Sequence, residues 1–86
     1  MGYKLVFWRG AIADLDALAP EIRKRIIVKL AWFAEQENPL VFARRLIDPA
    51  LGTYRYRVGD WRIIVDVEHD TIIILVVDHR NKIYRR

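Results

Sequence analysis

The chain has 86 residues, 53% hydrophobic and 12% aromatic, which excludes an intrinsically disordered protein and predicts one folded domain over residues 1–86. The 15 lysines and arginines outnumber the 11 acidic residues, so nucleic acid is a candidate partner; a slightly basic surface is the alternative. The absence of cysteine and serine excludes disulfides, thiolate metal sites and thiol or serine nucleophiles.

The first half of the chain predicts one strand followed by two helices. Tyr3–Trp8 is aromatic and aliphatic, which is typical of a strand. Two sets of apolar residues then recur at helical spacing, over residues 11–18 (Ile12, Leu15, Leu18) and 21–36 (Ile22, Ile26, Leu30, Phe33). Pro20 fits the first turn of the second helix and Asn38-Pro39 ends it, so we expect a helical hairpin.

The second half predicts three strands. Residues 40–46 favour one more short helical turn, and Asp48-Pro49 and Gly52 indicate a loop. The strands follow at Thr53–Val58, Trp61–Glu68 and Thr71–Asp78, joined at Gly59-Asp60 and His69-Asp70, and residues 81–86 form a short tail.

This order predicts an α+β fold. The N-terminal strand, the helical hairpin and a three-stranded antiparallel meander form a small sheet with the helices on one face. The nearly continuous β-branched run of Thr71–Asp78 predicts a central strand that is buried on both faces.

The predicted hairpin places arginines together. A two-residue turn at Gly59-Asp60 sets Arg57 opposite Arg62, with Arg55 on the same face, away from the helices. Like charges directly across a ladder are destabilising, so an anionic partner would explain the arrangement. The alternative is partial neutralisation by nearby carboxylates, namely Asp60, Asp66 or Glu68.

The tail adds Arg80 and Tyr84 at the end of the last strand, and the register can bring both to the arginines. Such a set can neutralise the charge of a phosphorane, and RNA supplies its own nucleophile, the 2′-hydroxyl. Tyr84 could take a proton if nearby arginines favour its phenolate form. No cofactor, metal or membrane segment is expected, and no secretion signal is evident, so the expected location is the cytoplasm.

Two segments carry a resemblance to a known family. Residues 52–64, GTYRYRVGDWRII, and 77–84, VDHRNKIY, resemble the RelE/ParE superfamily of bacterial and archaeal toxins, and the N-terminal half also fits. The resemblance implies a microbial-ribonuclease-like fold and a metal-independent endoribonuclease that cuts mRNA in the ribosomal A site. Such an enzyme leaves a 2′,3′-cyclic phosphate. It also implies a cognate antitoxin that wraps the toxin and blocks the site.

The resemblance implies a role for each cluster residue. Arg55 and Arg57 match positions that are often lysine in the family and that stabilise the transition state. Arg62 matches a phosphate-binding arginine, Arg80 an arginine near the leaving group, and Tyr84 the proposed general base. Arginine in place of lysine keeps the charge but weakens any role as proton donor. His79 could serve as the acid, or it could only shape the turn into the tail.

Further basic and aromatic residues are secondary candidates. Arg44 and Arg45 could contact RNA or form a solvated charge pair, and Lys82, Arg85 and Arg86 could attract phosphates. Lys24, Arg25 and Lys29 fit the solvated face of the second helix. Trp8, Trp32 and Trp61 could stack on bases, although Trp32 and Trp61 fit the core or an antitoxin groove better.

Two other functions remain open at this point. A ParE-like protein would inhibit DNA gyrase without nuclease activity, and a catalytically degenerate member would act as an antitoxin-binding or regulatory module. The same fold serves all three functions. The full set of four arginines and Tyr84 favours the nuclease, because ParE-like members usually lack it.

Overall fold

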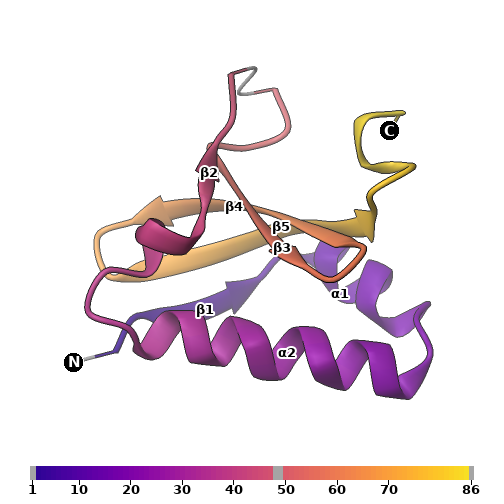
Figure 1. The fold of residues 1–86 in the computed structure, drawn as a ribbon, viewed down its shortest axis with the longest axis horizontal. Coiled ribbons are helices and arrows are strands. Elements are labelled where there is room, and N and C mark those ends of the chain that lie inside the picture. The colour runs from indigo at the N-terminus through magenta and orange to yellow at the C-terminus, as the bar shows by residue number, and fades with distance from the viewer. Residues whose placement is uncertain (1, 48–49, 86) are drawn as a thin grey trace.

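The computed structural model describes residues 2–47 and 50–85 and confirms the predicted α+β class. Its helices are α1 (Arg9–Asp16) and α2 (Pro20–Glu35), with short 3-10 helices η1 (Pro39–Phe42) and η2 (Ile83–Arg85). Its strands are β1 (Lys4–Phe7), β2 (Arg44–Arg45), β3 (Tyr54–Val58), β4 (Trp61–Glu68) and β5 (Thr71–His79). They form one sheet in the order β1-β5-β4-β3-β2 (Figure 1).

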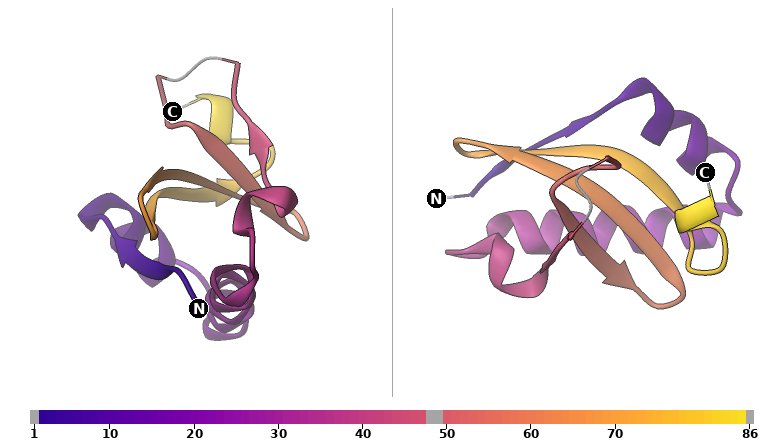
Figure 2. Two further views of the ribbon diagram at one scale, coloured as in Figure 1. Left: turned by 90° about the vertical axis from the view of Figure 1, so that its left-hand side faces the viewer. Right: turned by 90° about the horizontal axis from the view of Figure 1, so that it is seen from above.

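Both α-helices cover one face of the sheet, as predicted, while η2 lies on the other (Figures 1 and 2). The core lies between helices and sheet, because α2 directs its apolar stripe, including Ile26 and Leu30, at the inner face of the strands. Tyr56 of β3 stacks on Phe33 of α2 with ring centroids 4.2 Å apart. Its hydroxyl donates to the Pro39 carbonyl at 2.8 Å, so this buried polar group is satisfied.

The predicted hairpin register is confirmed. Val58 pairs with Trp61, and Arg57 pairs with Arg62. Gly59 takes a left-handed conformation with φ of 59°, which suits glycine at the first central position of a two-residue turn. The three strands β3, β4 and β5 therefore form the antiparallel meander that the sequence indicates.

Two strand pairings were not predicted. β1 lies parallel to β5, with Lys4 opposite Thr71, and the two-residue β2 extends the sheet beyond β3. The prediction that Thr71–Asp78 is the central strand is wrong, because β1 covers one edge of β5 and β4 occupies the centre of the sheet. The segment buried on both faces is the middle of β4, where three consecutive residues, Ile63–Val65, are fully buried. A register shift opposite Ile64 and Val65 interrupts the β4–β5 ladder at this point.

Two local predictions need correction, and two others fall outside the described residues. The helical turn predicted for residues 40–46 is confirmed only at its start, because η1 ends at Phe42 and Arg44–Arg45 are strand. Ile12 is 48% exposed rather than part of the core face. Asp48-Pro49 lies outside the described residues, and so does Arg86.

The face of the sheet away from the helices has its own apolar contacts. Gly52 packs so closely on this face that an added Cβ would lie 2.5 Å from Ile64 and 3.0 Å from Leu75. The next residue, Thr53, is held by the Asp66 carboxylate, which accepts bonds from both its backbone N–H and its hydroxyl at 2.8 Å. These contacts fix where residues 50–53 end and where β3 begins.

Candidate functional site

The strands β3 and β4 place three arginines on the face opposite the helices. Because side chains alternate along a strand, Tyr56 and Ile63 enter the core while Arg55, Arg57 and Arg62 point the other way. We call this set, together with Arg44 and Arg80, the arginine face. The sequence predicted its three central members, and the structure confirms their shared face.

Arg44 joins the arginine face through β2. It pairs directly with Arg55, while its neighbour Arg45 pairs with Tyr54. Both β2 arginines line a cavity of about 520 Å³ with Arg55 and Tyr84. The structure thus brings these secondary RNA candidates next to the predicted site, and both residues are exposed, as a solvated charge pair would also be.

Tyr84 reaches the arginine face from η2, the short helix after β5. Its hydroxyl accepts a hydrogen bond from Nη1 of Arg55 at 2.8 Å. Ile83, the preceding residue, is fully buried and anchors η2 against the sheet. The buried Nε of Arg55 has no hydrogen-bond partner in the described part of the chain, so this guanidinium is incompletely satisfied.

Arg80 is held at the β3–β4 turn. Its backbone N–H donates to the Asp60 carbonyl at 2.8 Å, and its Nη1 lies 3.8 Å from the Asp60 carboxylate. This ion pair is exposed, so it contributes little to stability, but the backbone bond fixes where the chain leaves β5. Asp60 therefore fixes the position of Arg80, a role that the sequence reasoning did not assign to it.

Arg62 lies at the centre of this charge. Partial burial lowers its pKa, and repulsion from Arg55, Arg57 and Arg80 lowers it further, while Asp60 acts in the opposite direction. Its Nη1 donates to the Gly59 and Trp61 carbonyls at 3.0 and 3.1 Å, which holds the side chain at the turn. The four guanidinium groups are close enough to repel one another, and a bound anion would relieve that repulsion.

Carboxylates neutralise the cluster only in part. The alternative interpretation was that Asp60, Asp66 or Glu68 neutralises the arginines. Asp66 accepts its hydrogen bonds from Thr53, and Glu68 lies at the far end of β4, so neither is placed for that role. Asp60 does neutralise part of the charge, through its ion pair with Arg80. Asp78, which the sequence reasoning missed, lies directly across the ladder from Arg62. A correct register for β4 and β5 would have identified it.

Three other predicted residues lie elsewhere. Lys82 and His79 line a cavity of about 350 Å³ beside α1, on the helix side of the sheet. His79 packs edge-on against Trp61, and its Nδ1 accepts the Asn81 backbone N–H at 3.2 Å, which favours its role in shaping the turn. Arg85 is exposed in η2, one residue beyond Tyr84.

The described residues hold no cluster of three or more side chains suited to bind a metal ion. Within the same residues, no helix has the length and apolar character needed to cross a membrane. The candidate site therefore consists of guanidinium groups, one phenol and flanking carboxylates.

The fold and site together define a small basic α+β protein that presents a cationic sheet face. Residues 5–84 match the family described as the ParE toxin of type II toxin-antitoxin systems, parDE. The chain belongs to the RelE/ParE family, and it is a toxin of a type II toxin-antitoxin system.

Individual relatives agree with this assignment. The chain is 38% identical to toxin RelG of Mycobacterium tuberculosis over 88 residues, covering 100% of both chains. It is 36% identical to toxin RelE3 of Methanocaldococcus jannaschii over 83 residues, covering 94% of each. The toxin-antitoxin complex RelBE2 of M. tuberculosis contains a chain of the same fold, with a TM-score of 0.77 and 31% identity, matching 93% of this chain and 100% of that one.

Proposed function

We propose that the protein is an endoribonuclease that cleaves mRNA in the ribosomal A site and so arrests growth. The observation that carries the proposal is the hydrogen bond between Arg55 and Tyr84 within a cluster of guanidinium groups. A phenol held by an arginine, beside an excess of positive charge, suits proton transfer at a phosphodiester.

In the proposed reaction, the 2′-oxygen of one nucleotide attacks the adjacent phosphorus. The new 2′-O–P bond forms while the P–5′-O bond breaks, which leaves a 2′,3′-cyclic phosphate and a free 5′-hydroxyl. Tyr84 is the general base that accepts the proton of the 2′-hydroxyl, and water supplies the proton that the leaving 5′-oxygen needs.

The arginines have the electrostatic role. Arg62, with Arg55 and Arg57, neutralises the charge that develops on the phosphorane, and Arg80 lies towards the leaving group. A guanidinium is a poor proton donor, so we assign no proton transfer to these residues. The charge needed for the reaction then comes from the protein's own side chains, without a metal ion or small-molecule cofactor.

We further propose that a cognate antitoxin is the protein partner. Structural neighbours are toxin-antitoxin complexes from M. tuberculosis and M. jannaschii, which supports this partner for a chain of the same fold. An antitoxin that covers the arginine face with acidic residues would bind less tightly as salt increases. The proposed substrate and target, mRNA on ribosomes, place the action in the cytoplasm.

A second candidate is inhibition of DNA gyrase without nuclease activity. The observation that favours it is the matching family itself, which is described by the ParE toxin. The arginine face would then bind an acidic protein surface or DNA, and Tyr84 would have no chemical role.

Toeprinting on translating ribosomes separates the two candidates. The proposal expects cuts within A-site codons that disappear in Tyr84→Phe and in Arg62→Gln, while both variants still bind antitoxin. Cleavage that survives both changes would show that the site is assigned wrongly. Growth arrest without cuts, together with loss of gyrase supercoiling activity, would favour the second candidate.

A further inference from the structure

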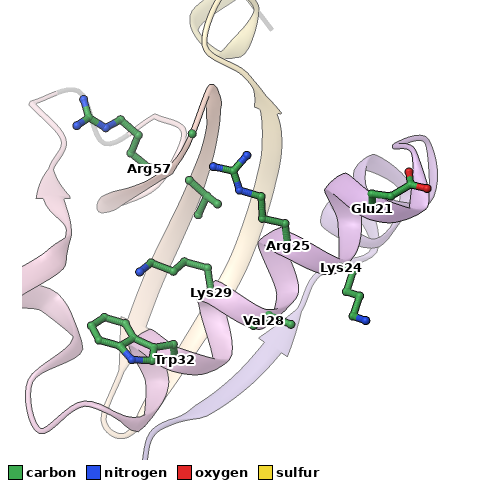
Figure 3. Close-up of a pocket in the computed structure, with 9 residues that line it drawn as sticks. Glu21, Lys24, Arg25, Val28, Lys29, Trp32 and Arg57 are labelled. Atoms are coloured by element: carbon green, nitrogen blue, oxygen red, sulfur yellow. The ribbon is translucent and has the colours of Figure 1, made fainter.

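A groove separates α2 from the turn between β3 and β4 (Figure 3). It encloses about 690 Å³. One wall comes from α2 and the other from the end of the β3–β4 hairpin, and the lining residues are Glu21, Lys24, Arg25, Val28, Lys29, Trp32, Arg57, Val58 and Gly59. The sequence suggested only a solvated helix face here, because the hairpin that forms the second wall is distant in the chain.

The charge of this groove is strongly positive. Four of its lining side chains are cationic and only Glu21 is acidic. Arg25 extends from α2 to the hairpin, where its Nη2 lies 2.9 Å from the position that a Cβ on Gly59 would take. Three of the cations come from α2 and Arg57 comes from the hairpin, so the charge around the groove favours an anionic ligand.

Trp32 gives the groove an aromatic surface. Its ring packs edge-on against Phe33 and Phe42, yet the residue remains 41% exposed. The Lys29 ammonium lies 4.4 Å from the Trp32 ring centroid. A positively charged groove with an exposed aromatic ring is the combination with which proteins hold single-stranded nucleic acid, by phosphate contacts and base stacking.

Arg57 connects this groove to the arginine face. It lines the groove and also a smaller cavity of about 250 Å³ that includes Arg44 and Arg55. β2 pairs with β3 only at Tyr54 and Arg55, so Arg57 lies at the open edge of the sheet. An RNA chain that leaves the arginine face at this edge meets the groove next.

We propose that the groove binds the single-stranded RNA that flanks the cleavage site. Lys24, Lys29 and Arg57 contact successive phosphates, and Trp32 stacks on a base. The proposal rests on the proposed function and adds a second binding region, which makes affinity depend on RNA length. An acidic protein segment is the competing occupant.

The test compares a 12-nucleotide and a 3-nucleotide oligouridylate, each labelled with fluorescein, by anisotropy over a range of salt concentrations. The protein carries Tyr84→Phe so that the RNA stays intact. In this background we expect Lys24→Gln/Lys29→Gln to weaken binding of the long RNA by about three- to tenfold and to reduce its salt slope by roughly 1.4, since each lost phosphate contact removes about 0.7. Binding of the short RNA stays unchanged.

The matched control is Lys4→Gln, an exposed lysine on β1 at the opposite edge of the sheet, which should leave both affinities as they are. The proposal is overturned if the double variant binds the long RNA like its parent, if both RNAs weaken equally, or if the parent binds no long RNA. Unchanged RNA binding with weaker antitoxin binding would assign the groove to a protein.

RNA binding by the groove and mRNA cleavage on ribosomes are measured separately, so each can fail without the other. A groove that does not bind RNA leaves A-site cleavage by the wild-type chain intact. Absence of cleavage on ribosomes would instead remove the proposed function.

Discussion

The Tyr84 hydroxyl accepts its hydrogen bond from an arginine 29 positions earlier in the chain, Arg55, at a distance of 2.8 Å. The bond joins η2 to β3 and orients the phenol at the edge of the arginine face. Because the Arg55 guanidinium donates to the phenol oxygen, Arg55 fixes the orientation in which Tyr84 would meet the 2′-hydroxyl of the proposed substrate. The two residues should therefore behave as one functional unit.

The first prediction concerns this unit. Tyr84→Phe and Arg55→Gln should each lower the single-turnover rate of mRNA cleavage on ribosomes by about 10²–10⁴-fold. The cleavage rate of the double variant should be only slightly lower than that of the slower single variant, because each change disables the same proton transfer. A loss equal to the product of the two single effects would show that they act independently. Arg9→Gln, on α1, should cleave normally.

The second prediction concerns the repulsion between Arg57 and Arg62, which pair directly across the ladder. Arg57→Thr should raise the free energy of unfolding by about 0.2–1 kcal/mol, because it removes a like-charge pair, and it should weaken RNA binding. Urea unfolding measures the gain. The matched control is Lys4→Thr, whose cross-strand neighbour is Thr71. An equal gain in the control would attribute the effect to the strand propensity of threonine.

The third prediction compares two glycines. Gly52→Ala should destabilise the fold by about 1–3 kcal/mol, because the new methyl group would press against Ile64 and Leu75. Gly10→Ala in α1 should instead stabilise it by roughly 0.5–1 kcal/mol, since the nearest atom to its Cβ lies at an ordinary 3.7 Å and alanine favours helix. Thermal unfolding of both variants checks the opposite signs, and a stabilising Gly52→Ala would contradict the close packing.

The fourth prediction concerns alkaline pH. Burial, with a smaller contribution from Tyr3, raises the pKa of Tyr56 to about 12. The folded chain thus keeps a proton that the unfolded chain loses above its ordinary pKa of about 10. The free energy of unfolding should therefore fall as pH rises from about 10 towards 12, and below that range this group should have no effect.

Tyr56→Phe isolates this contribution. The variant should be about 0.5–1.5 kcal/mol less stable at neutral pH, because the Pro39 carbonyl loses its donor. Between about pH 10 and 12 its stability should fall less steeply than that of the wild type. Parallel curves for the two proteins would show that the Tyr56 hydroxyl titrates alike in the folded and unfolded chains.

Local signals in the sequence were sufficient for the hairpin and its arginines. A two-residue turn fixes the partners of every residue on either side, so the opposition of Arg57 and Arg62 followed from Gly59 and strand alternation alone. The helical hairpin followed in the same way from Pro20 and the apolar spacing of α2. The sequence also predicted that the tail after the last strand can bring Tyr84 to the arginines, and Tyr84 contacts Arg55.

Features that depend on distant segments were not predictable. The two residues of β2 carry no periodicity, and their pairing with β3 depends on how the intervening segment folds. Lys24 and Lys29 have the pattern of a solvated helix face, and only the approach of the β3–β4 turn makes that face a groove wall. The burial of both faces of β4 results from its place in the middle of the sheet, which no single strand's composition specifies.

The parallel pairing of β1 with β5 sets an order of assembly. The first strand of the chain has no sheet partner until residues 71–74 are available, so its docking depends on one of the longest loop closures in the molecule. Local contacts in α2 and the β3–β4 hairpin can form earlier, because they join residues that are close in sequence. A ribosome that synthesises this chain therefore releases the segment bearing Arg55, Arg57 and Arg62 before the sheet can be completed, and the mature toxin exists only after β5 has emerged.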